Sequence, residues 1–261
     1  MENMEFAKFL MERIGRTIPS STEPPSEYKC EKCHDSGWII CEEDGYRYSR
    51  KCSCRLAREA EEMLRNSGLA DTVSQQTFDA FKTDTIAQSM VKGMAEKYLE
   101  TLLTDWGKPR MPWLYIGGNP GSGKTHICTA VCGQLLRHNI GVKYMQWLNE
   151  SRKLKAGVND ENFEDAVSEY IGVPVLYIDD LLKQKYVEEP KFSEADIKIA
   201  FTILNARYIM NKPTIISSEW DLIDQLLTAD EGLFSRIYER SKGFTINISR
   251  KRENNYRLNG G

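Results

Sequence analysis

The sequence lacks the features that mark a membrane-bound or secreted protein. None of its 261 residues lies in an uninterrupted apolar run near the roughly 20 residues that a helix needs to cross a bilayer. The N-terminus begins Met1-Glu2-Asn3-Met4-Glu5, whereas a secretory signal has a basic region followed by an apolar one. These absences predict a cytoplasmic protein that does not associate with membranes.

A large charge of one sign is also absent. The 35 basic and 38 acidic residues leave a formal net charge of −3, which argues against a protein held on nucleic acid by bulk charge, although a local basic groove remains open. The chain has no internal repeat and no long low-complexity tract. Its 41% of hydrophobic residues is enough for a packed core. The length suits one full-sized domain with a small appendage.

Cysteine is not scarce, and its clustering is informative. Five of the seven cysteines fall between positions 30 and 54, and in a chain expected in the cytoplasm this favours metal binding or reactive thiols over disulfides. Cys30-x2-Cys33 and Cys52-x-Cys54 form two pairs separated by 18 residues. Four thiolates in two such pairs can close a structural, tetrahedral Zn²⁺ site and replace a core that so short a segment cannot build.

Other interpretations of the cysteines stay open. His34 or Cys41 could replace one ligand, and the thiols could be reduced without metal or form a redox pair. Cys128 and Cys132 lie four residues apart in a helical pattern, which is more typical of buried packing than of metal ligation.

The N-terminal part is predicted to form a separate small domain. The segment Glu5–Ile14 has apolar residues at helical spacing, and the cysteine cluster follows it. A second helix is predicted at Arg55–Asn66, which is rich in strong helix formers and stops at a Ser-Gly pair. With a boundary near residues 68–75, residues 1–70 form one domain and residues 71–261 the other.

The remainder alternates apolar strands with helical patterns. Strands are predicted at Trp113–Gly117, Val142–Gln146, Val173–Ile178, Pro213–Ser217 and Phe244–Ile248. Helices are predicted at Ile86–Leu103, Lys124–His138, Asn162–Tyr170, Ser193–Met210 and Leu233–Arg240. Strands joined by helices of this length form right-handed crossovers, so we expect an α/β fold with a mostly parallel, five-stranded sheet covered on both faces.

A glycine-rich loop after the first of these strands predicts nucleotide binding. It matches G-x4-G-K-T and consists of Gly118, Asn119, Pro120, Gly121, Ser122, Gly123, Lys124 and Thr125. Glycines let such a loop wrap phosphates with its backbone N–H groups pointing inward, and the next helix directs its positive end at them. Lys124 is expected to contact the β- and γ-phosphates of ATP, and Thr125 to bind Mg²⁺. A chance match would not explain the strand before the loop or the helix after it.

An acidic pair complements this loop. Asp179 and Asp180 end an apolar strand, and carboxylates at this end of a central strand lie where open α/β sheets bind ligands. We expect Asp179 to share the Mg²⁺ with Thr125, and Asp180 to orient or activate the attacking water. The alternative is that both aspartates cap the next helix. Because Asp180 is shorter than the glutamate often found there, binding is better supported than efficient hydrolysis.

Together these motifs resemble the bacterial and phage replicative helicase loaders of the DnaC/DnaI type, which are AAA+ ATPases. The resemblance covers residues 28–261 and rests on the order and spacing of CEKCHDSGW, CSCRLAREAEEMLRNSGL, TFDAF, GNPGSGKTH, VLYIDD, LNARY, KPTIISS, SRIYER and NYR. A zinc segment before an AAA+ core is similar to the phage and Gram-positive members. Only 21 residues follow Arg240, so no helical lid is expected after the sheet.

The resemblance implies roles for residues at the nucleotide. Residues 118–125, followed by His126, would form Walker A, and Asp179 with Asp180 would form Walker B. Ser218 or Glu219 would take the sensor position, where family members usually have asparagine.

It also implies roles for three arginines. Arg240 first, and Arg236 second, would be the arginine finger that reaches the nucleotide of a neighbouring subunit. The alternative is two surface arginines one helical turn apart. Arg257, in the terminal Tyr-Arg pair, would act at the nucleotide or a subunit interface, unless it belongs to a frayed basic tail.

The partners that the resemblance implies are a hexameric replicative helicase, held by the N-terminal domain, single-stranded DNA, and further copies of the chain in a nucleotide-dependent assembly. A basic groove with a stacking aromatic binds single strands, and the segment from Trp147 through Arg152, Lys153 and Lys155 could supply one, unless Trp147 is core and the lysines are solvated. Phe78 and Phe81 could pack beside adenine, although core packing is the more ordinary interpretation.

The leading hypothesis is an ATP-dependent loader of a hexameric helicase onto single-stranded DNA during replication initiation, with slow, switch-like hydrolysis. A transposition-helper ATPase shares the same core, but the zinc-bearing N-terminus argues against it. A nucleotide-binding, non-catalytic replication adaptor is the alternative from another class.

Overall fold

The chain forms two compact units, residues 1–56 and 57–261. The structure, a computed structural model, describes residues 28–43, 46–157, 163–183, 192–226, 230–249 and 254–255. The division falls inside helix α2 (Ser53–Ser67). Met63 and Leu64, in the second half of this helix, pack on the core of the second unit.

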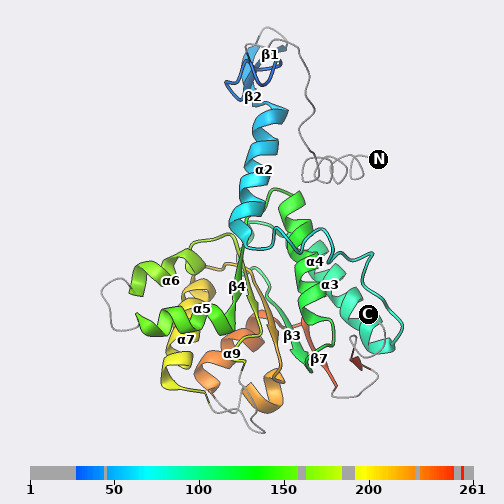
Figure 1. Cartoon of the computed structure of the whole chain (residues 1–261), viewed down its shortest axis with the longest axis vertical. Helices are drawn as coiled ribbons and strands as arrows, with labels where there is room; N and C mark the ends of the chain where they lie inside the picture. Colours follow the sequence, from blue (N-terminus) through cyan, green and yellow to red (C-terminus); the bar gives the residue numbers. More distant parts are fainter. Residues whose placement is uncertain are drawn as a thin grey trace, which may run out of the picture. The chain divides into compact units, whose positions relative to one another are not determined.

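The described residues of the first unit form almost no apolar core. Its hairpin consists of strands β1 (Trp38–Glu43) and β2 (Tyr46–Lys51), which pair antiparallel and are blue in Figure 1. Sequence analysis did not predict these strands, and every side chain of β2 is exposed. Among the described residues of this unit, only Cys33, Gly37 and Cys52 are buried. Something other than hydrophobic packing must therefore hold the unit together.

The second unit is built on the predicted parallel sheet. Its strands are β3 (Leu114–Gly118), β4 (Val142–Gln146), β5 (Val175–Asp179), β6 (Thr214–Ser218) and β7 (Thr245–Ile248). They pair in the order β4-β5-β6-β3-β7, and every pairing is parallel. The α/β fold and the five expected strands are confirmed, with ends shifted by at most two residues.

Helices cover both faces of this sheet (Figure 1). They are α3 (Ile86–Thr104), α4 (Lys124–Arg137), α5 (Trp147–Ala156), α6 (Phe163–Ile171), α7 (Glu194–Ile209) and α9 (Glu231–Arg240), with a π-helical turn η1 (Leu222–Leu226). Successive side chains of a strand point to opposite faces. Leu114 and Ile116 of β3 accordingly pack with α3 and α4, whereas Tyr115 packs with α5, α6, α7 and α9.

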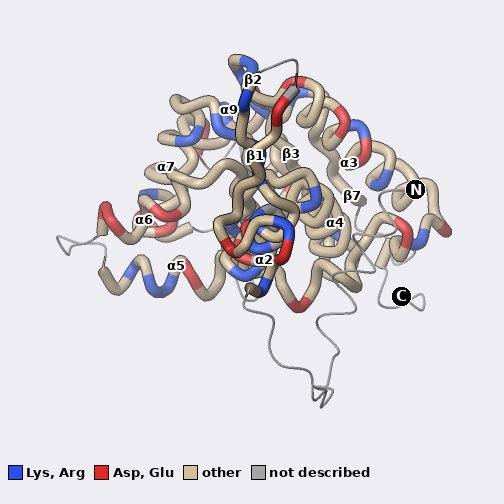
Figure 2. The backbone as a smooth tube through the Cα atoms, turned by 90° about the horizontal axis from the view of Figure 1, so that it is seen from above, with Lys and Arg blue, Asp and Glu red and all other residues tan. Residues whose placement is uncertain are grey.

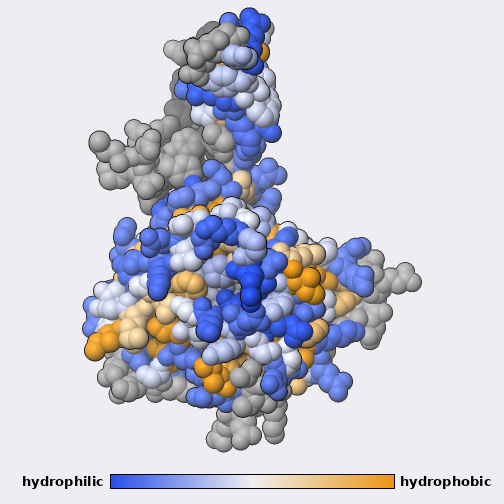
Figure 3. All heavy atoms as spheres, turned by 180° about the vertical axis from the view of Figure 1, so that it is seen from behind, coloured by the Kyte–Doolittle hydropathy of each residue, from blue (hydrophilic) through white to orange (hydrophobic). Residues whose placement is uncertain are grey.

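Helix α5 was not predicted, because it begins at Trp147 directly after β4 ends at Gln146, with no glycine or proline to mark the change. Outside the two cores, hydrophilic residues predominate on the face shown in Figure 3, with hydrophobic residues scattered among them. Within the described ranges, no helix is both long enough and apolar enough to cross a membrane.

Candidate functional site

The phosphate loop connects the end of β3 to the start of α4 and depends on glycine geometry. Gly118, Gly121 and Gly123 have φ angles of 138°, 80° and 85°, which are costly for residues with a Cβ. A Cβ on Gly118 would also lie 2.7 Å from the carbonyl oxygen of Ile248, and one on Gly121 would lie 2.5 Å from Oδ1 of Asn255. The close approach of the chain on both sides thus requires glycine here.

Lys124 is held inside this loop. Its side chain is 5% exposed, and Nζ donates hydrogen bonds to the carbonyl oxygens of Gly118 at 2.7 Å and Asn119 at 2.8 Å. Burial lowers the pKa of Lys124, because the charged form loses water. Phosphate oxygens are stronger partners for an ammonium group than neutral carbonyls are, so this lysine is placed to exchange the loop carbonyls for a phosphate.

Thr125 and Asp179 lie together although 54 residues separate them. Thr125 Oγ1 donates to the carboxylate of Asp179 at 3.1 Å and 3.4 Å. The contact forms because β3, which leads into the phosphate loop, and β5, which ends in Asp179, are separated only by β6 in the sheet. A hydroxyl and a carboxylate are ligands that Mg²⁺ prefers, so this pair fits a magnesium ion bound with ATP.

Three further hydroxyl groups surround Asp179, and sequence analysis missed them. Tyr144 donates at 3.0 Å, Tyr177 at 2.7 Å and Ser217 at 2.5 Å. They come from β4, β5 and β6. Burial raises the pKa of both tyrosines, so the phenols keep the protons that they donate. Tyr177 could have been found, since a residue two positions before Asp179 on one strand faces the same way.

Asp180 takes part in a separate ion-pair group. Its φ is 56°, and its backbone N–H donates to Ser217 Oγ at 3.0 Å. Its carboxylate accepts from Lys183 Nζ at 2.8 Å, and the same Nζ lies 2.8 Å from Glu219 Oε1. Sequence analysis did not anticipate Lys183.

The phosphate loop and the Asp180 ion-pair group share one pocket of about 190 Å³. The phosphate loop, Lys124, Thr125 and His126 line it from one side, and Asp180, Lys183 and Glu219 line it as well. His126 is also anchored, because its Nε2 lies 2.9 Å from the carbonyl oxygen of Thr77. Sites that enclose a drug-sized ligand measure about 300–1,000 Å³, so this pocket suits the phosphates rather than a whole nucleotide.

Ser218, expected at the nucleotide, lies outside this pocket. It is fully buried, and its Oγ donates to the carbonyl oxygen of Leu181 at 3.0 Å and accepts from the backbone N–H of Trp220 at 3.2 Å. Strand alternation is the reason, since Ser217 faces Asp179 and its neighbour must face the other way. From this end of β6, Glu219 is the side chain that reaches the pocket.

The two candidate finger arginines differ in accessibility. Arg240 is 8% exposed, donates to the Tyr208 carbonyl at 2.7 Å and to Asn211 Oδ1 at 2.5 Å, and stacks on the Tyr208 ring. Arg236 is only half-buried and donates from Nε to Asn205 at 2.9 Å. Arg240 is thus the more buried of the two candidates. Arg257 lies outside the described residues.

Of the two interpretations left open for Trp147, core packing is the one that the structure shows. Trp147 is 1% exposed and belongs to the core, so it cannot stack on a base. Lys153 pairs with Glu150 at 2.8 Å and Lys155 with Asp196 at 2.6 Å, and Figure 2 shows both signs of charge along α5. Four other residues belong to the core, as the sequence favoured: Phe78, Phe81, Cys128 and Cys132.

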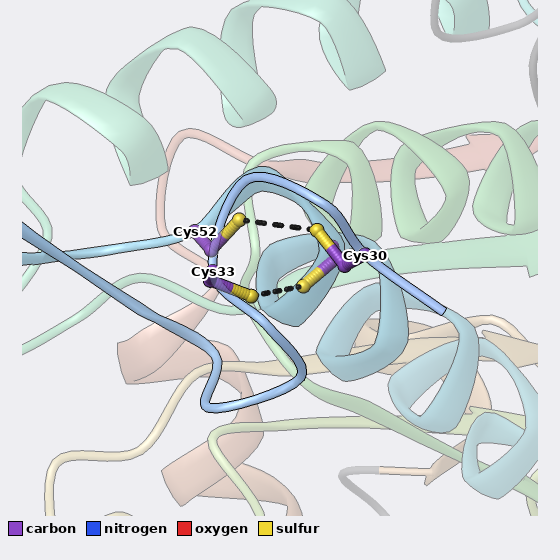
Figure 4. Close-up of side chains that lie close together, drawn as sticks. Cys30, Cys33 and Cys52 are labelled. Carbon is purple, nitrogen blue, oxygen red and sulfur yellow. Dashed lines mark hydrogen bonds between the residues drawn. The ribbon is translucent and has the colours of Figure 1, made fainter. Parts of the chain in front are cut away.

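The four predicted cysteines of the first unit converge. Sγ of Cys30 lies 3.7 Å from that of Cys52, and Sγ of Cys33 lies 3.4 Å from that of Cys54, as the close-up in Figure 4 shows for the labelled residues. All four sulfurs lie within 4.8 Å of one another. Tetrahedral zinc with Zn–S bonds of about 2.3 Å requires sulfurs about 3.8 Å apart, so this set fits the metal.

Backbone hydrogen bonds reach two of the four sulfurs. The Gly37 N–H donates to Cys33 Sγ at 3.3 Å. A hydrogen bond from the Cys54 backbone lowers the pKa of Cys52 to about 6, whereas burial raises the pKa of Cys54 to about 12. The two alternative ligands lie elsewhere: His34 stacks on Tyr28, and Cys41 is paired with Tyr48 in the hairpin. The cluster therefore consists of the two cysteine pairs alone among the described residues.

Comparison with known proteins finds similar sequences. The family model described as "IstB-like ATP binding protein" matches residues 45–259. Phage-like element PBSX protein XkdC of Bacillus subtilis (strain 168) is 30% identical over 242 residues, which cover 90% of this chain and 88% of that protein.

Two solved structures share the fold. The crystal structure of the DnaC helicase loader has a TM-score of 0.55 and 20% identity, over 68% of this chain and 98% of that one. The crystal structure of DnaI has a TM-score of 0.51 and 20% identity, over 76% of this chain and 99% of that one. At this identity the likeness shows the α/β fold of the second unit and leaves activity to be argued from the site.

Proposed function

Because the chain belongs to the family of IstB-like ATP-binding proteins, we propose that it is an AAA+ ATPase that loads a hexameric replicative helicase onto single-stranded DNA. The observation that carries the ATPase part is the contact between Thr125 and Asp179 beside the buried Lys124. These side chains place a hydroxyl, a carboxylate and an ammonium group where a phosphate loop holds a nucleotide.

Each group at the pocket has a proposed role. The phosphate loop and His126 hold the phosphates of ATP, and Lys124 turns from the loop carbonyls to the β- and γ-phosphates. Thr125 and Asp179 hold Mg²⁺, which would neutralise charge that develops on the phosphates. Asp180, whose backbone is fixed by Ser217, orients the attacking water. Hydrolysis is slow and acts as a switch.

Two residues complete the site in this proposal. Arg236 serves as the arginine finger toward a neighbouring subunit, because it is more accessible than Arg240. Arg257 acts at the nucleotide. In support of this role, Asn255, two residues earlier, lies against the phosphate loop and donates to the Pro120 carbonyl at 3.4 Å.

The N-terminal domain, proposed as residues 1–70, is the arm that contacts the helicase. Zn²⁺ held by Cys30, Cys33, Cys52 and Cys54 would stabilise the fold of the arm. Exposed hydrophobic residues on its hairpin support a role in protein contact, since Tyr46 is 79% and Ile40 77% exposed.

Two other functions remain as alternatives. A transposition-helper ATPase is favoured by the name of the family model, but the match starts at residue 45, after Cys30 and Cys33. A non-catalytic adaptor is favoured by the ion pair of Lys183 with Asp180 and Glu219, which occupies the two positions that would serve hydrolysis and sensing.

The ATPase part is tested with Lys124→Ala. We expect the variant to lose ATP hydrolysis down to background, because the charge that holds the β- and γ-phosphates is removed. The control is Lys143→Ala, which removes a lysine paired with Glu169 outside the pocket. Equal rates for the wild type and Lys124→Ala would contradict an ATPase and favour the adaptor.

The loader part is tested by native mass spectrometry of the protein with the host's hexameric replicative helicase, with and without ATP. We expect a complex whose amount depends on the nucleotide, and the masses give its stoichiometry. No complex in any nucleotide state would contradict helicase loading and favour a transposition helper.

A further inference from the structure

Lys183 joins the ends of two neighbouring strands at the nucleotide pocket. Its Nζ lies 2.8 Å from Asp180 Oδ2, just after β5, and 2.8 Å from Glu219 Oε1, just after β6. All three side chains line the same pocket as Lys124 and Thr125. The Lys183 side chain is 34% exposed and that of Glu219 is 18% exposed, so both are partly withdrawn from water but open to the pocket.

Glu219 presents a charge problem for any bound triphosphate. Its carboxylate lines the pocket that holds the phosphates, and two anions in a site with little water repel each other strongly. The two can share the pocket at low cost only if a cation lies between them. Lys183 is a cation already in contact with Glu219, whereas the hydrogen bonds of Lys124 go to the phosphate loop.

The hydrogen-bonding capacity of Lys183 matches this role. An ammonium group has three N–H donors. Among the described residues, the carboxylates of Asp180 and Glu219 accept two of them. Burial works to lower the pKa of Lys183, but its hydrogen bonds to Asp180 and Glu219 outweigh burial and raise that pKa. Lys183 therefore stays charged across the neutral range and keeps a donor for another oxygen.

We propose that Lys183 binds the terminal phosphate of ATP and bridges it to Glu219 and Asp180. This inference rests on the proposed function, because it assumes that this pocket binds ATP. ADP lacks the terminal phosphate, so the contact forms with ATP and not with ADP. Because Asp180 follows β5 and Glu219 follows β6, the ends of these two strands are in contact with the phosphate only when ATP is bound.

The test measures dissociation constants for a non-hydrolysable ATP analogue and for ADP by calorimetry. Lys183→Met removes the bridging charge and leaves Glu219 beside the phosphate, so we expect analogue binding to weaken at least tenfold and ADP binding less than twofold. Glu219→Gln removes the opposing anion, so we expect tighter analogue binding, and in the double variant part of the lost affinity returns. Lys183→Arg, which keeps the charge, retains the preference for the analogue.

Lys143→Met is the matched control, because Lys143 also pairs with a glutamate, Glu169 at 2.9 Å, but lies outside the pocket. We expect it to change neither constant. Unchanged ratios of the two constants in both Lys183→Met and Glu219→Gln would overturn the inference while leaving the ATPase proposal intact. If the wild-type protein bound neither the ATP analogue nor ADP, both this inference and the ATPase proposal would be overturned. Thermal melting of each variant establishes that it is folded before binding is measured.

Discussion

Asp179 shows how single residues define the candidate site. Its carboxylate accepts hydrogen bonds from the hydroxyl groups of Thr125, Tyr144, Tyr177 and Ser217. Four donors from different elements fix the position of this carboxylate. A metal-binding carboxylate that is held in this way needs little rearrangement when a nucleotide and its ion arrive.

Ser217 and Ser218 provide a matched test at this scale, because both are fully buried and each makes two hydrogen bonds. Ser217→Ala and Ser218→Ala should each lower the free energy of unfolding by about 1–3 kcal/mol, since buried polar partners are left unsatisfied. Only Ser217→Ala should also lower the ATPase rate severalfold, because only Ser217 holds Asp179 and Asp180. Denaturant unfolding and steady-state ATPase assays measure the two effects, and equal rates in both variants would contradict this assignment.

At the scale of elements, α9 presents two arginines one turn apart with different surroundings. Arg240 lies against Tyr208 and Asn211 at the end of α7, so its charge serves the packing of one helix on another. Arg236 donates from Nε to Asn205 and from Nη1 to the Gly232 carbonyl within α9, and its guanidinium lies over the rings of Phe201 and Tyr208. A half-buried arginine of this kind can turn toward a neighbouring subunit at smaller cost than a buried one.

This difference predicts opposite phenotypes. Arg236→Ala should lower ATP hydrolysis at least tenfold with little change in the melting temperature, because a finger arginine acts on the transition state. Arg240→Ala should lower the melting temperature by several degrees, because hydrogen bonds and stacking between helices are lost. ATPase assays at several protein concentrations and thermal melting test this. The reverse pattern would restore Arg240 as the finger.

At the scale of the whole molecule, the two units are stabilised by different means. The second unit has two apolar clusters, one on each face of its sheet. The described part of the first unit buries little besides Cys33 and Cys52. Its folding should therefore depend on zinc, whereas the second unit should fold without it.

Measuring the zinc content of the native protein tests whether the first unit depends on zinc. We expect about one zinc per chain, lost in Cys52→Ser and retained in Cys41→Ser, whose thiol lies outside the cluster. Chelation or Cys52→Ser should expose the first unit to proteases while nucleotide binding by the second unit persists. Less than half an equivalent of zinc in native protein would contradict a zinc site.

Local patterns were sufficient for most elements and for the phosphate loop. Apolar runs predicted all five strands of the sheet within two residues, and the G-x4-G-K-T pattern located Lys124 and Thr125. The hairpin of the first unit was missed because its strand Tyr46–Lys51 is wholly exposed and so has no alternation of apolar and polar residues. Trp147 was taken as a possible DNA contact because no local pattern separates a buried tryptophan from an exposed one.

The sequence by itself determined the parallel sheet, the phosphate loop, the acidic pair and the cysteine pairs, because each depends on residues close together in the chain. Only the tertiary structure decided that Tyr144 and Ser217 contact Asp179, that Lys183 joins Asp180 to Glu219, and that Arg240 is buried. These contacts depend on the strand order β4-β5-β6-β3-β7 and on how α9 meets α7. Neither arrangement is encoded in local periodicity, since both follow from packing between segments far apart in the chain.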